Sequence, residues 1–297
     1  MSHMVIFGAG ASYGSGDVTP YPPPLGNQLF EKLEALGKTA SRIPPHIKES
    51  FKENFEKGMA EYFIHSDMNI MSFQRDLAGY LAKFTPGEVN HYSRLIRKLN
   101  NRRTIYSTLN YDLLFEIAAN RLNYNTNYSN EYNNGFVRLL KIHGSCNFWP
   151  NLAENAFKNV HITGCVDADM NIGIKPVSQS QSLWKAMTED SIAPSLAMYA
   201  EGKAVRVSPG YVLHQQEMWV QSLNAASKVF IVGVKIHQAD IHIWKNLAEC
   251  KADIHYFGLE QDKADFKEWQ KRSRHKNATF YKLDFKNAVD TIANLAR

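Results

Sequence analysis

One short stretch near the start of the chain constrains its fold more than any other. Residues 4–12 read Met-Val-Ile-Phe-Gly-Ala-Gly-Ala-Ser. Successive apolar residues suit a strand that is buried on both faces, as in a parallel sheet, and the glycines after it let backbone N–H groups approach a ligand closely. The stretch predicts a first strand that runs into a phosphate-binding loop, although a Gly-x-Gly pair alone is equally typical of an ordinary strand-to-turn connection. The predicted loop residues are Gly8, Ala9, Gly10 and Ser12.

Two later stretches, residues 104–112 and 137–145, have the same form, an apolar run that ends in polar residues. Their polar residues include Thr108, Asn110 and Asp112 in the first stretch and His143 in the second. All strands of a parallel sheet end at the same edge, so three such endings would converge on one crevice. The pattern therefore predicts an α/β fold, a Rossmann-like parallel sheet with helices on both faces.

Three blocks stand at these strand ends, in the order Gly8-Ala9-Gly10-Ala11-Ser12, Thr108-Leu109-Asn110-Tyr111-Asp112 and Lys141-Ile142-His143-Gly144-Ser145. Together they resemble the signature blocks of the sirtuin-like superfamily. The Asn-Tyr-Asp and Lys-x-His-Gly-Ser forms are most similar to those of the bacterial sirtuin-like NAD hydrolases of anti-phage defence. The resemblance runs from about residue 5 to residue 292 and implies one sirtuin-like NAD-binding and hydrolase domain over residues 4–297.

The resemblance also implies an activity, with NAD as the substrate. An NAD+ glycohydrolase of this family would cleave the nicotinamide–ribose bond to give nicotinamide and ADP-ribose, or a cyclic form. Such an enzyme would be a regulated, NAD-depleting effector of abortive infection, and it would assemble as a homo-oligomer or with a HerA-type ATPase or an Argonaute-type partner. A second function stays open, that of a non-catalytic sensor which binds NAD or ADP-ribose derivatives and controls a partner protein.

The chemistry of this cleavage requires few protein groups. It passes through an oxocarbenium-like centre, but nicotinamide leaves as a neutral group and needs no general acid. Asn110 can bind the ribose or a water through its amide, and His143 can accept a proton at neutral pH. Asp112 can orient either the imidazole or the ribose. The predicted catalytic residues are therefore Asn110, His143 and Asp112.

Two further apolar runs extend the predicted nucleotide-binding set, which also includes Thr108. The run over residues 228–234 contains Gly233 and is followed by Lys235, where the superfamily usually has Gly-x-Ser. Lys235 either binds a phosphate of the nucleotide or is a solvated loop lysine. A later run ends shortly before Glu260, whose carboxylate can meet an adenosine ribose hydroxyl as in dinucleotide folds.

Helical spacing of apolar residues predicts a helical lobe over residues 38–100, inserted between the first and second core strands. The helices expected in and before it cover residues 25–36, 51–63, 73–84 and 89–99. The Gly- and Pro-rich residues 12–24, the Asn-rich residues 120–134 and residues 151–191 are expected to be irregular. Residues 12–24 also lack the Phe-Arg pair that is usual in sirtuins.

Composition excludes several classes of protein. With 297 residues, 44% hydrophobic and 21% charged, the chain is expected to be globular, and without a run of roughly 18 apolar residues it is expected to be cytoplasmic, with no membrane partner. Three scattered cysteines predict neither a disulfide framework nor the zinc ribbon of deacylating sirtuins. His237, His242, His255 and His275 lack ligand spacing, so no metal site is predicted. A net charge of +5 and basic clusters at predicted helix ends do not favour direct nucleic-acid binding.

Overall fold

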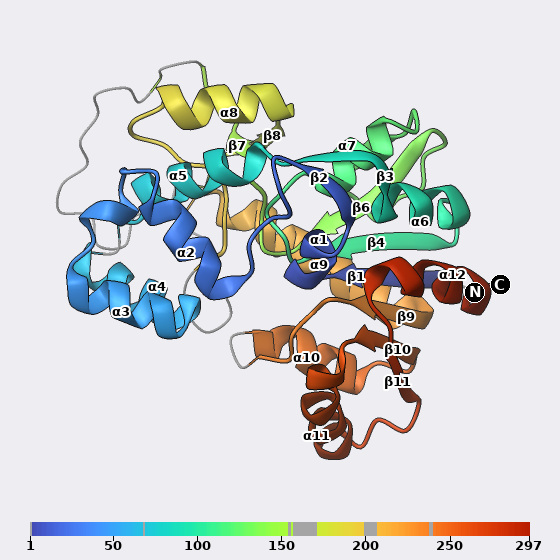
Figure 1. The fold of residues 1–297 in the computed structure, drawn as a ribbon. Helices are drawn as coiled ribbons and strands as arrows, with labels where there is room; N and C mark the ends of the chain where they lie inside the picture. The colour runs from blue at the N-terminus through green and yellow to red at the C-terminus, as the bar shows by residue number, and fades with distance from the viewer. Residues whose placement is uncertain (1, 68, 154–155, 157–170, 199–206, 238–239) are drawn as a thin grey trace.

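The computed structural model describes residues 2–67, 69–153, 156, 171–198, 207–237 and 240–297. Its centre is a seven-stranded sheet in which every paired neighbour is parallel, in the order β11-β10-β9-β1-β4-β6-β5 (Figure 1). The strands are β1 (Ser2–Phe7), β4 (Thr104–Thr108), β5 (Asn125–Asn127), β6 (Phe136–Lys141), β9 (Ala226–Val232), β10 (Asp253–Gly258) and β11 (Ala278–Lys282). Helices flank this sheet, so the predicted α/β, Rossmann-like class is confirmed.

The central strand β1 explains why the N-terminal apolar run forms the middle of the sheet. β1 pairs with β4 on one side and with β9 on the other. Side chains alternate across the sheet, so Val5 and Phe7 pack in one hydrophobic cluster while Met4 and Ile6 pack in another. All four are at most 1% exposed, as a strand covered on both faces requires.

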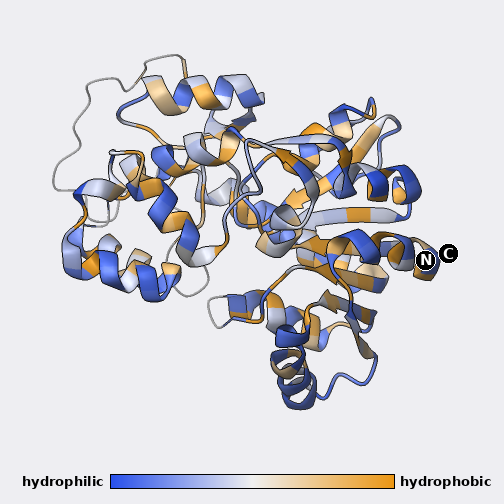
Figure 2. Ribbon diagram, viewed as in Figure 1, coloured by the Kyte–Doolittle hydropathy of each residue, from blue (hydrophilic) through white to orange (hydrophobic). Residues whose placement is uncertain are grey.

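Each face of the sheet has its own layer of helices. The Val5 face is covered by α6 (His91–Leu99), α7 (Leu114–Asn120) and α12 (Phe285–Leu295), and the Met4 face by α9 (Pro209–Ala225), α10 (Ile241–Glu249) and α11 (Lys263–Ser273). Figure 2 shows that the peripheral α11 is mainly hydrophilic, whereas the strands β1 and β9 at the centre contain long hydrophobic stretches. Within the described residues, no helix is both long enough and apolar enough to cross a membrane.

Between β1 and β4 the chain forms a set of helices at one end of the molecule (Figure 1). They are α2 (Gly26–Glu34), η1 (Ala40–Arg42), α3 (Pro45–Glu53), α4 (Phe55–His65) and α5 (Met71–Ala82). Phe51 stacks on Phe30 with ring centroids 4.1 Å apart and on Phe73 at 5.9 Å. These aromatic residues are therefore core residues, as expected for apolar residues at helical spacing.

The structure differs from the sequence prediction where polar side chains cap helices. One helix was expected over residues 51–63, but Asn54 interrupts it and accepts a hydrogen bond from the Lys57 N–H as the N-cap of α4. Asn90 likewise caps α6, so this helix begins at His91 and the preceding residues form β3 (Thr85–Asn90).

Three segments expected to be irregular contain short regular elements. The first contains the end of α1 (Ala9–Tyr13) and β2 (Gly16–Thr19), which pairs antiparallel with β3. The Asn-rich segment contains β5 at the edge of the main sheet. The third contains β8 (Ile174–Pro176), which pairs with β7 (Phe148–Pro150), and α8 (Gln179–Thr188), which begins with a capping box. Much of the remainder of this third segment lies outside the described residues.

Candidate functional site

The candidate site lies at the edge of the sheet where β9, β1, β4 and β6 end. From β1 the chain continues to β4, then to the edge strand β5 and back to β6, which lies between them, whereas β9 lies on the other side of β1 and leads to β10. The β1–β9 boundary is therefore a topological switch point, the place where open parallel sheets bind their ligands. Gly8, Asn110, His143 and Gly233 all follow strands that end at this edge.

At the switch point, the loops after β1 and β9 pack directly on each other. The Gly10 N–H donates to the Gly233 carbonyl at 2.9 Å. A Cβ on Gly8 would lie 2.5 Å from that same oxygen, and one on Gly233, whose φ is +62°, would lie 2.2 Å from the Ala11 nitrogen. The glycines are therefore required by the contact between the two loops, and the Gly10 N–H points to protein instead of to a ligand.

Ser12, Tyr92, Asn110 and Asp112 form one buried hydrogen-bonded group, which we call the serine network. The Ser12 hydroxyl donates to Asp112 Oδ2 at 2.7 Å, accepts from Asn110 Nδ2 at 2.8 Å and lies 3.1 Å from the Tyr92 hydroxyl. A serine hydroxyl has one proton and two lone pairs, so Tyr92 must donate to Ser12. Burial, and then the charge of Asp112, raise the pKa of Tyr92 well above its ordinary value, which keeps that proton in place.

The orientation of the Asn110 amide is determined by its partners. Nδ2 donates to the Gly8 carbonyl and to Ser12, both at 2.8 Å, and the Asn110 N–H donates to Thr108 Oγ1 at 3.0 Å. A carbonyl can only accept, so the atom facing Gly8 must be the nitrogen. Both amide protons are thereby used, and Oδ1 is the side-chain atom left to accept from a hydroxyl or a water.

Asp112 and Lys141 connect the ends of β4 and β6. Asp112 Oδ1 accepts from the Leu114 N–H at 3.0 Å. The Lys141 ammonium is fully buried and donates to the Asp112 carbonyl at 2.6 Å and to Glu116 Oε1 at 2.8 Å. A buried ammonium without such partners would be strongly unfavourable, so this pair holds the β4–α7 connection against β6.

His143, Asp240 and His242 form a second group, which we call the histidine cluster. Nε2 of His143 lies 3.1 Å from Nε2 of His242 and 3.7 Å from Oδ1 of Asp240. Asp240 is the N-cap residue of α10 and His242 lies in its first turn. Gly144 makes the turn after His143 with φ +84°, and a Cβ there would lie 2.0 Å from the Ser195 carbonyl.

The structure thus separates the three predicted catalytic residues. Asn110 and Asp112 belong to the serine network, and His143 belongs to the histidine cluster. The carboxylate of Asp112 bonds to Ser12 and Leu114, while the carboxylate that contacts the imidazole of His143 is that of Asp240. Of the two roles predicted for Asp112, orientation of the ribose is therefore the one that this geometry favours.

Sequence reasoning missed the role of His242 because it lies 99 residues from its partner. One signal was present, an Asp-x-His sequence at the start of a helix that follows a glycine-ended strand. Such a segment places an acid and an imidazole at the same sheet edge as the three signature blocks.

The remaining predicted residues lie at the ends of β9 and β10. Lys235 is exposed, two residues after Gly233. Glu260 begins η3 (Glu260–Asp262) and forms ion pairs with Lys282 at 3.1 Å and Lys263 at 3.6 Å. The hydrogen bond from Lys282, followed by the charge of Lys263, lowers the pKa of the Glu260 carboxyl. Its carboxylate is therefore engaged with surface lysines.

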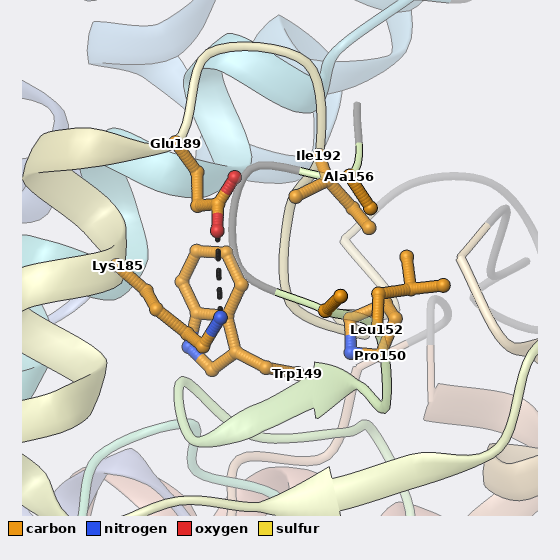
Figure 3. A pocket seen from close by; sticks show the side chains of 8 residues that line it. Trp149, Pro150, Leu152, Ala156, Lys185, Glu189 and Ile192 are labelled. Carbon is orange, nitrogen blue, oxygen red and sulfur yellow. Dashed lines mark hydrogen bonds and ion pairs between the residues drawn. The ribbon is translucent and has the colours of Figure 1, made fainter. Parts of the chain in front are cut away.

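Two concavities differ greatly in what they can hold. One of about 440 Å³ lies between α9 and α10, is lined by Ile142, Trp219 and His242 among others, and has the size of a small-ligand pocket. The other, of about 10 Å³, is lined by Trp149 and by the ion-paired Lys185 and Glu189 among others, and it has room for about one water (Figure 3). Of these two concavities, the larger, which His242 lines, has the volume for a small ligand.

Comparison with known proteins adds no identification. No protein-family model matches the chain, and no curated protein matches it. Any functional assignment consequently depends on the residues at this edge of the sheet.

Proposed function

We propose that the protein is a sirtuin-like NAD+ glycohydrolase, which cleaves the nicotinamide–ribose bond of NAD to give nicotinamide and ADP-ribose or a cyclic product. The observation that carries the proposal is the placement of three motifs on neighbouring strands. The loop of residues 8–12, Asn110 and His143 follow β1, β4 and β6, which are adjacent in the sheet and parallel. They share the edge at which dinucleotides bind to folds of this class.

The serine network is suited to the ribose side of the reaction. The transition state carries positive charge on the ribose, and fixed acceptors near it stabilise that charge without reorganisation. Asn110 Oδ1 is such an acceptor, and its orientation is fixed by Gly8 and Ser12. The buried carboxylate of Asp112 is linked to the Asn110 amide by two hydrogen bonds through Ser12.

The histidine cluster is suited to accept the proton that the attacking water or ribose hydroxyl loses. Cleavage by water, or cyclisation through a ribose hydroxyl, requires one proton acceptor, and a neutral imidazole can fill this role near neutral pH. His143 is only 1% exposed, so its imidazole is held in one environment. Asp240 lies 3.7 Å from Nε2, where a carboxylate favours the imidazolium that forms.

The resemblance of the three blocks to those of anti-phage NAD hydrolases also supports a proposal for the biological role. A cytoplasmic enzyme that depletes NAD harms its own cell, so we propose a regulated effector of anti-phage defence that is held inactive until it assembles. The assembly is either a homo-oligomer or a complex with a HerA-type ATPase or an Argonaute-type protein.

One observation favours a second candidate, a non-catalytic sensor of NAD or ADP-ribose derivatives. After β9 the chain has Gly233-Val234-Lys235 where the superfamily usually has Gly-x-Ser, so the serine contact to the nucleotide is lost. The two candidates differ in what substitutions of Asn110 and His143 change, because a sensor needs these residues for affinity alone.

The test is single-turnover release of nicotinamide from NAD by wild type, Asn110→Ala and His143→Ala, with NAD affinity measured by calorimetry. Each substitution should lower the rate by about 100-fold or more, because each removes an electrostatic or general-base contribution. Binding should weaken much less. The matched controls are Asn130→Ala and His214→Ala, two surface positions that should retain the wild-type rate.

Release by both variants at the wild-type rate would overturn the catalytic assignment. Binding of NAD without any cleavage by wild type, both alone and in its assembled form, with both substitutions acting on affinity alone, would replace the enzyme with the sensor.

A further inference from the structure

We propose that the histidine cluster is a binding site for a divalent transition-metal ion, Zn²⁺ in particular. The ligands are Nε2 of His143, Nε2 of His242 and a carboxylate oxygen of Asp240. Each of the three residues offers a ligand atom that lies within 4.8 Å of those of the other two. They come from two places in the fold, the end of β6 and the start of α10.

The distances match those of a metal centre. Zn–N bonds of about 2.0–2.1 Å at a tetrahedral angle hold two ligand nitrogens about 3.3 Å apart. The two Nε2 atoms are 3.1 Å apart, and the carboxylate oxygen of Asp240 lies 3.7 Å from Nε2 of His143. Both distances from His143 are therefore within a few tenths of an ångström of those in a tetrahedral site, and the third distance, between His242 and Asp240, lies within the 4.8 Å that spans the cluster.

The donor set determines which ions fit. Two imidazoles and one carboxylate suit Zn²⁺ and its first-row neighbours, whereas Mg²⁺ and Ca²⁺ require oxygen ligands. Three protein ligands leave one position of a tetrahedral Zn²⁺ open to water or to a ligand. The cavity of about 440 Å³ between α9 and α10, which His242 lines, provides space beside this cluster.

The site would also regulate the protein, an extension that rests on the proposed function. Nε2 of His143 cannot accept a proton while it is bonded to a metal. Bound Zn²⁺ would therefore inhibit NAD cleavage, and a chelator would restore it.

The experiment measures metal binding directly, whether or not the protein cleaves NAD. The full chain is stripped with chelator and titrated with ZnCl₂ by calorimetry, and with CoCl₂ by visible absorption, which reports coordination geometry. Wild type should bind one Zn²⁺ per chain, and Co²⁺ should give the strong absorption bands of a four-coordinate site. His242→Ala and Asp240→Asn should each weaken Zn²⁺ binding by about 100-fold or more, because each removes one of the three ligands.

His214→Ala is the matched control. His214 lies 3.6 Å from Glu217, and both side chains are well exposed, so this pair has one imidazole and one carboxylate without the third ligand. The variant should bind Zn²⁺ as wild type does. Thermal unfolding without metal shows that each variant is folded, and two independent ligand variants keep the test decisive if one of them is not.

The metal site would be overturned if wild type binds no Zn²⁺ at free concentrations up to about 100 micromolar. Equal Zn²⁺ binding by wild type, His242→Ala and Asp240→Asn would also overturn it. Failure of the proposed function gives a different result: one Zn²⁺ binds and depends on these ligands, but NAD is not cleaved with or without chelator.

Discussion

The serine network and the histidine cluster lie at the same edge of one sheet but are built differently. The serine network comes from the ends of the adjacent strands β1 and β4 and from α6, and its hydroxyl and amide protons all have assigned partners. The histidine cluster brings the end of β6 to the start of α10 and places ring nitrogens of His143 and His242 beside a carboxylate oxygen of Asp240. The first arrangement fixes a geometry, whereas the second presents the groups that we propose as metal ligands.

The comparison teaches how one site can combine rigidity with responsiveness. A buried network in which every hydroxyl and amide proton has a partner resists change, because a lost partner leaves an unsatisfied polar group. The proposed metal site would instead bind or release an ion at three side chains of the same sheet edge. We call the serine network and the histidine cluster the two halves of the site. Predictions on stability test whether the two halves differ in this way.

The largest effect is expected at Lys141, which joins the two halves at the end of β6. Lys141→Met would leave Glu116, whose side chain is only 11% exposed, without its cationic partner. Removing one member of a buried ion pair lowers the free energy of unfolding by about 3–5 kcal/mol, and urea unfolding would measure the loss.

Lys52→Met is the matched control, because it breaks the exposed pair with Glu49, which has a similar distance of 2.7 Å. It should leave the unfolding midpoint unchanged. Adding Glu116→Leu to Lys141→Met should recover part of the lost stability, since both charges are then absent. Equal midpoints for Lys141→Met and Lys52→Met would show that the buried pair does not join the two halves.

The next effect compares the two halves directly. Ser12→Ala removes the shared partner of Tyr92, Asn110 and Asp112, so the free energy of unfolding should fall by about 1–3 kcal/mol. His242→Ala should lower it by about 1 kcal/mol or less, because His242 is only half-buried and water can replace its partners. Urea unfolding at neutral pH and without metal measures both. A larger loss in His242→Ala than in Ser12→Ala would reverse the comparison and make the histidine cluster the structural half.

The smallest expected effect is the pH dependence of the free energy of unfolding, to which three histidines outside both halves contribute. Burial is the main cause that lowers the pKa values of His3, His91 and His255 below the ordinary histidine value. The unfolded chain therefore binds more protons than the folded chain as the pH falls below about 6.5. The stability contributed by the neutral imidazoles is fully present above that pH and is lost as the pH falls toward the folded pKa values.

Urea unfolding between pH 7.5 and 5.5 would measure this slope, and His255→Asn should make it shallower than in wild type. His255 is suitable because its ring stacks on Phe230, away from the site, with centroids 5.2 Å apart. A slope unchanged by His255→Asn would assign the acid sensitivity to groups other than His255.

The sequence by itself determined the architecture of the protein, because the signals for it are local. Unbroken apolar runs such as residues 4–7 can only be satisfied between two layers, and this requirement predicted the buried parallel strands and their shared edge. Polar residues immediately after those runs predicted that Ser12, Asn110 and His143 would stand at that edge. The capping residues Asn54 and Asn90 were visible too, but helical periodicity alone placed the helix boundaries wrongly.

Only the tertiary structure decided the partners of these residues. The bond from Gly10 to Gly233, the pairing of Lys141 with Glu116 and the contact of His143 with His242 join positions far apart in the chain. Such contacts depend on strand order and on the direction in which each loop leaves the sheet. Local periodicity predicts neither of these. Spacing along the chain therefore predicted which groups reach the edge of the sheet, while packing across β9, β1, β4 and β6 decided which of them meet.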